Sequence, residues 1–136
     1  MNITIGYNCW SNYDDVLLGS EIIRELNKEN IFENLHIISH SGYHTAPNQN
    51  QMKYLDRFIK INTKLDDLQN LNVNKVLAPA RIFEGYKIAY EYALKSNCEF
   101  AIVTNGDSWF FNLKKLKKLL NLNQLKNCCI SSRVGN

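Results

Sequence analysis

The chain lacks the features of several large protein classes. It has two prolines among 136 residues and fifteen aromatic residues, a composition that argues against a disordered chain. No hydrophobic run approaches the length of a membrane-spanning helix, and the N-terminus carries neither the basic nor the apolar segment of a signal peptide. The sequence therefore predicts a cytoplasmic protein whose residues 1–136 form a single domain.

Several motifs of cofactor-binding and catalytic proteins are also missing. No Gly-x-Gly-x-x-Gly follows the first predicted strand and no Walker loop is present, which disfavours a dinucleotide-binding domain and a P-loop enzyme. The serines lack a Gly-x-Ser-x-Gly setting. No Cys-x-x-Cys spacing occurs, so we interpret the four cysteines as structural thiols rather than zinc ligands or a disulfide framework. They are Cys9, Cys98, Cys128 and Cys129.

Acidic residues are absent after Asp107. The first 107 residues carry a net charge of −3 and the remaining residues +6, and most of that excess lies on a predicted helix from Leu113 to Leu125 that Asn112 caps. This lysine-rich helix has two interpretations: a solvated outer face, or an anchor at an anionic membrane surface that would suit a lipid-linked acceptor. We expect no nucleic-acid partner. Its apolar residues are expected to point inward: Leu113, Leu116, Leu119 and Leu120. Its lysines are expected to point outward: Lys114, Lys115, Lys117 and Lys118.

What the chain does contain is an alternation of strand and helix patterns. It predicts an α/β fold of three layers, with helices on both sides of a mostly parallel sheet. A stripe of apolar residues at helical spacing predicts that the helix 81–97 packs on the sheet through Ile82, Tyr86, Ala89, Ala93 and Leu94. Residues 70–79 show no clear pattern. The predicted elements are a strand from Ile3, a helix over 15–29, a strand 35–40, a loop 43–51, an edge strand 58–61, a short helix 65–71, the helix 81–97, a strand from Phe100, the lysine-rich helix and a strand 128–132.

The stretch from Glu99 to Phe111 is the centre of the functional prediction. Phe100 to Val103 is an unbroken apolar run that predicts a central strand buried on both faces, and it is followed by a turn sequence ending in Asp107. In open α/β sheets, ligands bind at the carboxyl ends of the strands. Asp107 is therefore a candidate ligand-binding residue, although an Asx-turn or a helix cap is the structural alternative.

The layout and this stretch together resemble a known family. A first strand opening into a helix, a long helix with Gly85, Ala89 and Ala93, and the strand ending in Asn105-Gly106-Asp107 resemble the N-terminal, nucleotide-sugar-binding part of GT-A glycosyltransferases of the family 2 kind. In that family the strand ends in Asp-x-Asp. The resemblance implies that Asp107 holds a divalent metal, Mn or Mg, that bridges the two phosphates of the donor. Asn105 then stands in the place of the first aspartate, as an auxiliary uncharged ligand.

The resemblance also suggests where the nucleotide lies. Tyr7 and Asn8 match the place where the family contacts the nucleotide, and the Tyr7 ring could stack on a uracil or simply fill the core. His40 or Ser41 could contact the base, and ordinary loop polarity is the alternative. His40 also belongs to a run of three histidines spaced four residues apart with His36 and His44, but on a strand this spacing does not indicate a metal site.

The resemblance implies an enzyme that transfers a sugar from a nucleotide-diphosphate donor to an acceptor of unknown identity. A divalent cation neutralises the charge of the leaving nucleotide as the glycosidic bond breaks. The acceptor-binding half of the family follows the metal strand by many residues, so no catalytic base is assigned and a partner chain is expected to supply the acceptor site. The alternative is a truncated, non-catalytic module that binds a nucleotide or a partner.

Overall fold

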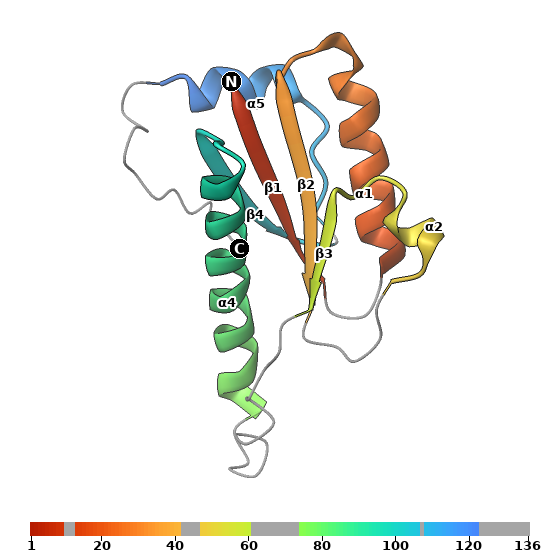
Figure 1. Cartoon of the computed structure of the whole chain (residues 1–136), viewed down its shortest axis with the longest axis vertical. Helices are drawn as coiled ribbons and strands as arrows, with labels where there is room; N and C mark the ends of the chain where they lie inside the picture. The colour runs from red at the N-terminus through yellow and green to blue at the C-terminus, as the bar shows by residue number, and fades with distance from the viewer. Residues whose placement is uncertain (10–12, 42–46, 61–73, 107, 123–136) are drawn as a thin grey trace, which may run out of the picture.

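The chain forms a parallel sheet with helices packed against it. The computed structural model describes residues 1–9, 13–41, 47–60, 74–106 and 108–122. Within them, four strands lie in the order β3-β2-β1-β4, and every neighbouring pair is parallel (Figure 1). The predicted α/β class and the predicted edge position of the third strand are therefore confirmed. The strands are β1 (Asn2–Asn8), β2 (Asn34–Ser41), β3 (Arg57–Lys60) and β4 (Phe100–Asn105).

The helices connect these strands in the alternation that the sequence predicts. The predicted helix over 15–29 corresponds to α1 (Tyr13–Leu26) and the 3-10 turn η1 (Asn27–Glu29) that continues it. The predicted loop 43–51 was wrong in part, because α2 (Gln49–Met52) begins inside it. The long helix α4 (Asn74–Lys95) starts earlier than residue 81, and α5 (Leu113–Leu120) is shorter than predicted. The predicted helix 65–71 and strand 128–132 lie outside the described residues.

One face of the sheet packs against α1. Ile3, Ile5 and Tyr7 alternate along β1, and all three side chains are fully buried. They belong to one apolar cluster with Val16 and Ile23 of α1. Because alternate residues of a strand point to the same face, this cluster forms the core on the α1 side of the sheet.

The other face packs against α4. A methyl group built on Gly6 would lie 2.9 Å from the Cβ of Ala89, so the glycine allows β1 and α4 to approach closely. Ala89 and Ala93 are buried, whereas Tyr86 and Leu94 of the predicted core stripe are 51% and 60% exposed. The prediction that these two pack on the sheet was wrong, because the helix presents its small residues to the strands. α1 and α4 thus lie against opposite faces of β1 (Figure 1).

β4 is less buried than the sequence predicts. Among the described residues it pairs only with β1, which makes it an edge strand of the sheet. Ala101 and Asn105 are exposed, and the other residues of β4 are half-buried. The prediction of a central strand buried on both faces was therefore wrong for this part of the chain. A short apolar run cannot distinguish a central strand from an edge strand.

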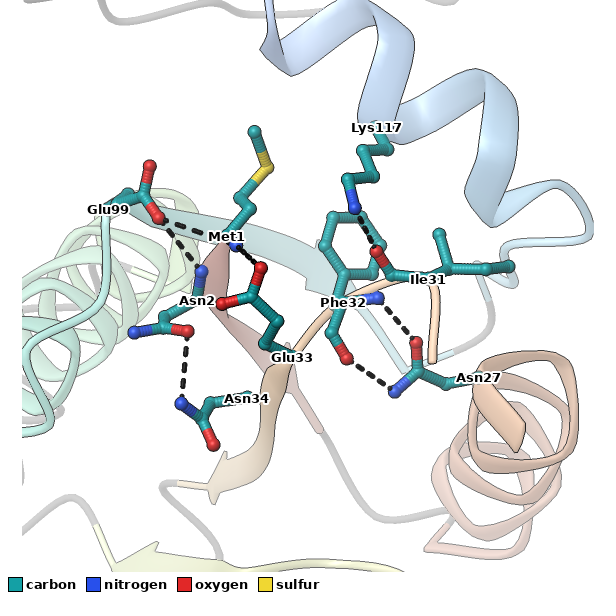
Figure 2. Close-up of polar contacts among 9 residues, drawn as sticks. All are labelled: Met1, Asn2, Asn27, Ile31, Phe32, Glu33, Asn34, Glu99 and Lys117. Atoms are coloured by element: carbon teal, nitrogen blue, oxygen red, sulfur yellow. Dashed lines mark hydrogen bonds and ion pairs between the residues drawn. The ribbon is translucent and has the colours of Figure 1, made fainter. Parts of the chain in front are cut away.

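α5 closes the amino edge of the sheet. The predicted cap is confirmed, because the Asn112 side chain accepts a hydrogen bond of 2.8 Å from the backbone N–H of Lys115. Leu113 is buried in the core, whereas Leu119, which the sequence predicts to point inward, is 48% exposed. The Lys117 ammonium donates to the Ile31 carbonyl at the start of the β2 segment (Figure 2).

The start of β1 is held at this same edge by polar contacts (Figure 2). The amino group of Met1 lies 3.0 Å from a Glu33 carboxylate oxygen and 3.8 Å from one of Glu99. The N–H of Asn2 donates to that Glu99 oxygen at 3.1 Å. The Asn34 side chain donates to the Asn2 side chain at 3.0 Å. Three chain segments are thereby joined at the amino edge.

A partly exposed hydrogen-bond network built on Asp56 joins α1, β2 and the start of β3. One Asp56 carboxylate oxygen accepts hydrogen bonds from Arg24 at 2.6 Å and from the Ile37 N–H at 2.5 Å. Arg24 also donates to the Leu35 carbonyl at 2.9 Å. Asp56→Ala is expected to lower the free energy of unfolding by about 1–3 kcal/mol, because it leaves a backbone donor and a guanidinium without their acceptor. Urea unfolding followed by circular dichroism measures the loss.

Glu25→Ala is the matched control for this prediction. Glu25 pairs with Lys28, and both side chains are about two-thirds exposed. An exposed ion pair of this kind contributes little, so we expect a change below about 0.5 kcal/mol. Equal losses in the two variants would contradict a structural role for the Asp56 network.

Candidate functional site

The candidate site lies at the carboxyl edge of the sheet, where β1, β2 and β4 end together. Asn8 is the register partner of Asn105 on one side and of His40 on the other. Partners in a parallel sheet point to the same face, so these three polar side chains form a row across three strands. We call Asn105, Asn8 and His40 the polar row. The structure thus unites residues that lie far apart in the sequence.

The turn after β4 reaches back across the end of β1. The Gly106 N–H donates to the Asn8 carbonyl at 3.0 Å. A methyl group built on Gly106 would lie 2.9 Å from Cγ2 of Val16, so this turn contacts the beginning of α1 directly. The helix N-terminus, the turn and the polar row therefore meet at one edge. Asp107, the residue predicted to hold the metal, follows Gly106 and lies outside the described residues.

The members of the polar row differ in exposure. Asn105 is exposed, Asn8 is 7% exposed and His40 is fully buried. The two ring nitrogens of His40 have no hydrogen-bond partner within the described part of the chain, and burial lowers the pKa of this histidine to about 4. At pH 7, all three side chains of the polar row are therefore uncharged. Amide oxygens of this kind can accept hydrogen bonds or act as weak ligands for a hard cation.

His40 is buried because α4 leaves room for it. A methyl group built on Gly85 would overlap the imidazole ring. A fully buried ring cannot contact a nucleobase at the surface, so in this structure the predicted base contact is not available to His40. His36, on the same face of β2, stacks edge-on against Tyr92 of α4 with ring centroids 5.7 Å apart. His44 lies outside the described residues.

Tyr7 fills the core. Its side chain is fully buried on the α1 side, and burial raises the pKa of its hydroxyl group above the ordinary value. The hydroxyl oxygen would lie 2.8 Å from a methyl group built on Gly19, so the ring occupies the space that this glycine leaves in α1. Such a ring offers no face to a uracil, and of the two interpretations that the sequence left open, the core position describes Tyr7 here.

Two exposed aromatic residues near the site were not predicted. The Trp109 indole N–H donates to the Asp15 carbonyl in the first turn of α1 at 3.1 Å, and its side chain is 36% exposed. Phe111, which is 68% exposed, stacks edge-on against Trp109 with centroids 6.4 Å apart. The sequence signal was available, because an aromatic run begins two residues after Asp107. This aromatic pair provides a surface on which a planar base can stack.

The lysine-rich helix lies at the other end of the strands. Lys114 forms an ion pair of 2.5 Å with Glu29, and Lys117 is bound to the backbone, so two of its four lysines are engaged at the amino edge. A shallow groove of about 430 Å³ along α5 is bordered by Lys115 and Lys118. It is separate from the polar row, which lies at the carboxyl edge. None of the described helices has both the length and the apolar character needed to cross a membrane.

Within the described part of the chain, no group of three or more His, Cys, Asp or Glu side chains could hold a metal ion. Comparison with known proteins adds no further constraint: no protein-family model matches this sequence, and no curated protein or solved structure matches it.

Proposed function

We propose that the chain is a glycosyltransferase module of the GT-A kind, with three layers, that binds a nucleotide-diphosphate sugar at the carboxyl edge of its sheet. The observation that carries the proposal is the polar row beside the Gly106 turn and the start of α1. Hydrogen-bonding side chains from separate strands meet there, at the edge where parallel sheets bind ligands. Asn8 and Asn105 would contact the ribose or the phosphates.

A divalent cation, Mg or Mn, completes this proposal. Asp107 would be its carboxylate ligand and Asn105 an auxiliary oxygen ligand, and the donor phosphates and water would fill the remaining positions. The oxygen donors of this edge fit a hard cation, but the uncharged amides alone would bind it weakly. When bound, such a cation neutralises the charge on the leaving nucleotide diphosphate.

We place the nucleobase against the aromatic pair. Trp109 and Phe111 are exposed and follow Asp107 closely in the chain, whereas Tyr7 is buried. Stacking on Trp109 would position the base beside the first turn of α1, where the indole is fixed by its bond to Asp15. Trp109→Leu is therefore the variant that probes the base-binding part of the proposal.

The acceptor is proposed to bind on a partner chain. A membrane bound through the lysines of α5 would lie at the amino edge, at the opposite end of β1 from the polar row. A lipid-linked acceptor held there would be far from the sugar. An acceptor site supplied by a second protein at the carboxyl edge avoids this separation.

Titration calorimetry tests the donor site. Uridine and guanosine diphosphate sugars are titrated into the full chain with and without Mn²⁺. We expect Asp107→Ala to weaken the Mn²⁺-dependent affinity at least about tenfold, because it removes the one carboxylate ligand. Glu99→Gln, at the opposite end of β4, is the matched control and should leave that affinity unchanged.

A donor-hydrolysis assay then distinguishes an enzyme from a binding module. Mn²⁺-dependent release of the sugar from the preferred donor, lost in Asp107→Ala, supports the transferase. Binding without release supports the alternative, a non-catalytic nucleotide-binding module. Metal-dependent affinity that survives Asp107→Ala unchanged would refute the assignment of this site.

A further inference from the structure

The outer face of α4 exposes four large apolar side chains. Phe83 is 69% exposed, Tyr86 51%, Tyr90 60% and Leu94 60%. Their spacing of three or four residues places them along one side of the helix, next to the small buried residues Ala89 and Ala93 that face the sheet. We call these four residues the α4 stripe.

Such a stripe is unusual on a helix that already has one side in the core. The outward side of a surface helix is normally polar, and contiguous exposed apolar patches mark interaction sites. α4 flanks the sheet on the face opposite α1 (Figure 1), and more than half of each stripe residue is exposed. The stripe is therefore a candidate contact surface, and the charges beside it indicate which partner it fits.

We propose that the α4 stripe pairs with the same stripe of a second copy of this chain, with the two helices antiparallel. Lys87 and Glu91 are exposed one turn apart along one border of the stripe, and neither forms an ion pair among the described residues. In an antiparallel pair, Lys87 of each copy lies beside Glu91 of the other, which gives two ion pairs. A parallel pair would not bring these side chains together, because it places the Lys87–Glu91 borders of the two copies on opposite sides of the contact.

The antiparallel arrangement also brings the apolar residues of the two stripes together. With the two-fold axis beside Ile88 and Ala89, Phe83 of one copy lies opposite Leu94 of the other, and the two Tyr90 rings lie near the centre. In an isologous contact of this kind both copies use the same surface, so the assembly ends at a dimer. A partner of different sequence would need its own complementary stripe and charges, whereas a second copy supplies both.

The contact is small, so we expect the dimer to be weak. About three turns of helix bury less than the roughly 1,200 Å² of a standard stable interface, and a dissociation constant of about 10–100 µM is the expected range. All four residues of the stripe lie on α4, and none of them belongs to the polar row or to the aromatic pair. Dimerisation therefore does not depend on the proposed donor site, and either proposal can fail alone.

Sedimentation equilibrium over about 1–300 µM protein tests the pairing. The wild-type chain should show a monomer–dimer equilibrium. Tyr90→Lys should weaken it at least about tenfold, because it places two positive charges at the centre of the contact. Leu18→Lys, at an exposed apolar position of α1, is the matched control and should leave the dissociation constant unchanged. Circular dichroism verifies that the variants are folded.

A charge exchange tests the antiparallel arrangement. Lys87→Glu and Glu91→Lys should each weaken the dimer severalfold, and the double variant should restore the wild-type dissociation constant because the ion pairs are re-formed in reverse. Failure of the double variant to recover would overturn the antiparallel pairing. A wild-type chain that stays monomeric at 300 µM, or a dimer unaffected by Tyr90→Lys, would overturn the proposal as a whole.

Discussion

Gly85→Ala is expected to lower the free energy of unfolding by about 2–3 kcal/mol, the cost of overpacking a well-filled core. The sign of this change is informative, because a Gly→Ala substitution in the interior of a helix normally raises the free energy of unfolding by about 0.5–1 kcal/mol. Here the new methyl group would overlap the buried His40 ring, which packs directly on the α4 backbone. Chemical denaturation at pH 7 measures the change.

Two further variants test whether the clash with the His40 ring causes this loss of stability. Lys95→Ala, at an exposed position in the last turn of α4, should change stability by less than about 0.5 kcal/mol. Combining Gly85→Ala with His40→Ala removes the ring that the methyl group would strike. The double variant should therefore lose less than the sum of the two single changes. Strict additivity would show that the two residues do not compete for the same space.

The second large effect is a loss of stability on acidification that His40 controls. Burial lowers the pKa of His40 from its ordinary value near 6.5 to about 4, and its ring nitrogens have no partner among the described residues. Between these two pH values the unfolded chain binds a proton that the folded chain does not. The contribution of His40 to stability is therefore nearly constant above pH 7 and falls as the pH drops, by about 2 kcal/mol between pH 7 and pH 5.

The two carboxyl groups with lowered pKa values lose their contributions in a more acidic range than His40. The Glu29 carboxyl has its pKa lowered by Lys114, and that of Glu33 is lowered by the N-terminal amino group, so their contributions are lost only below about pH 4.5. Urea unfolding at intervals from pH 7.5 to pH 5 thus reports mainly on histidines. His40→Asn should flatten the profile, whereas His36→Gln should keep most of the slope. A slope retained in His40→Asn would contradict the assignment.

The parts of the fold that the sequence predicted well are those governed by local patterns. The helix over 15–29 and the cap at Asn112 were predicted from apolar periodicity and helix-start chemistry, and both are confirmed. These signals depend on residues within one or two turns. The carboxyl end of β4 was also predicted, because a turn sequence follows the apolar run.

The predictions that failed depended on which side of an element meets the core. Tyr86 and Leu94 fit a helical stripe as well as Ala89 and Ala93 do, yet only the alanines face the sheet. The choice follows from Gly6, whose missing side chain lets α4 approach β1 closely enough that only small residues fit. A helix pattern alone does not reveal this restriction.

The candidate site was also predicted only in part. The sequence identified Asn8, Asn105 and Asp107 as residues that follow or end strands, and the glycosyltransferase role of Asp107 stays a prediction. It gave no sign that Asn8 and Asn105 would be register partners, and it left open whether Tyr7 fills the core or contacts a nucleotide. Strand order joins residues across most of the chain, and a linear pattern carries no information about it.

The sequence by itself determined the alternation of strand and helix, because hydrophobic periodicity and capping act over a few residues. Only the tertiary structure decided that β4 lies beside β1, that His40 is buried against Gly85, and that α4 turns its aromatic side outward. The physical reason is that these outcomes depend on close packing between segments far apart in the chain. Such packing is set by shape and volume once the elements meet, and no short stretch encodes it.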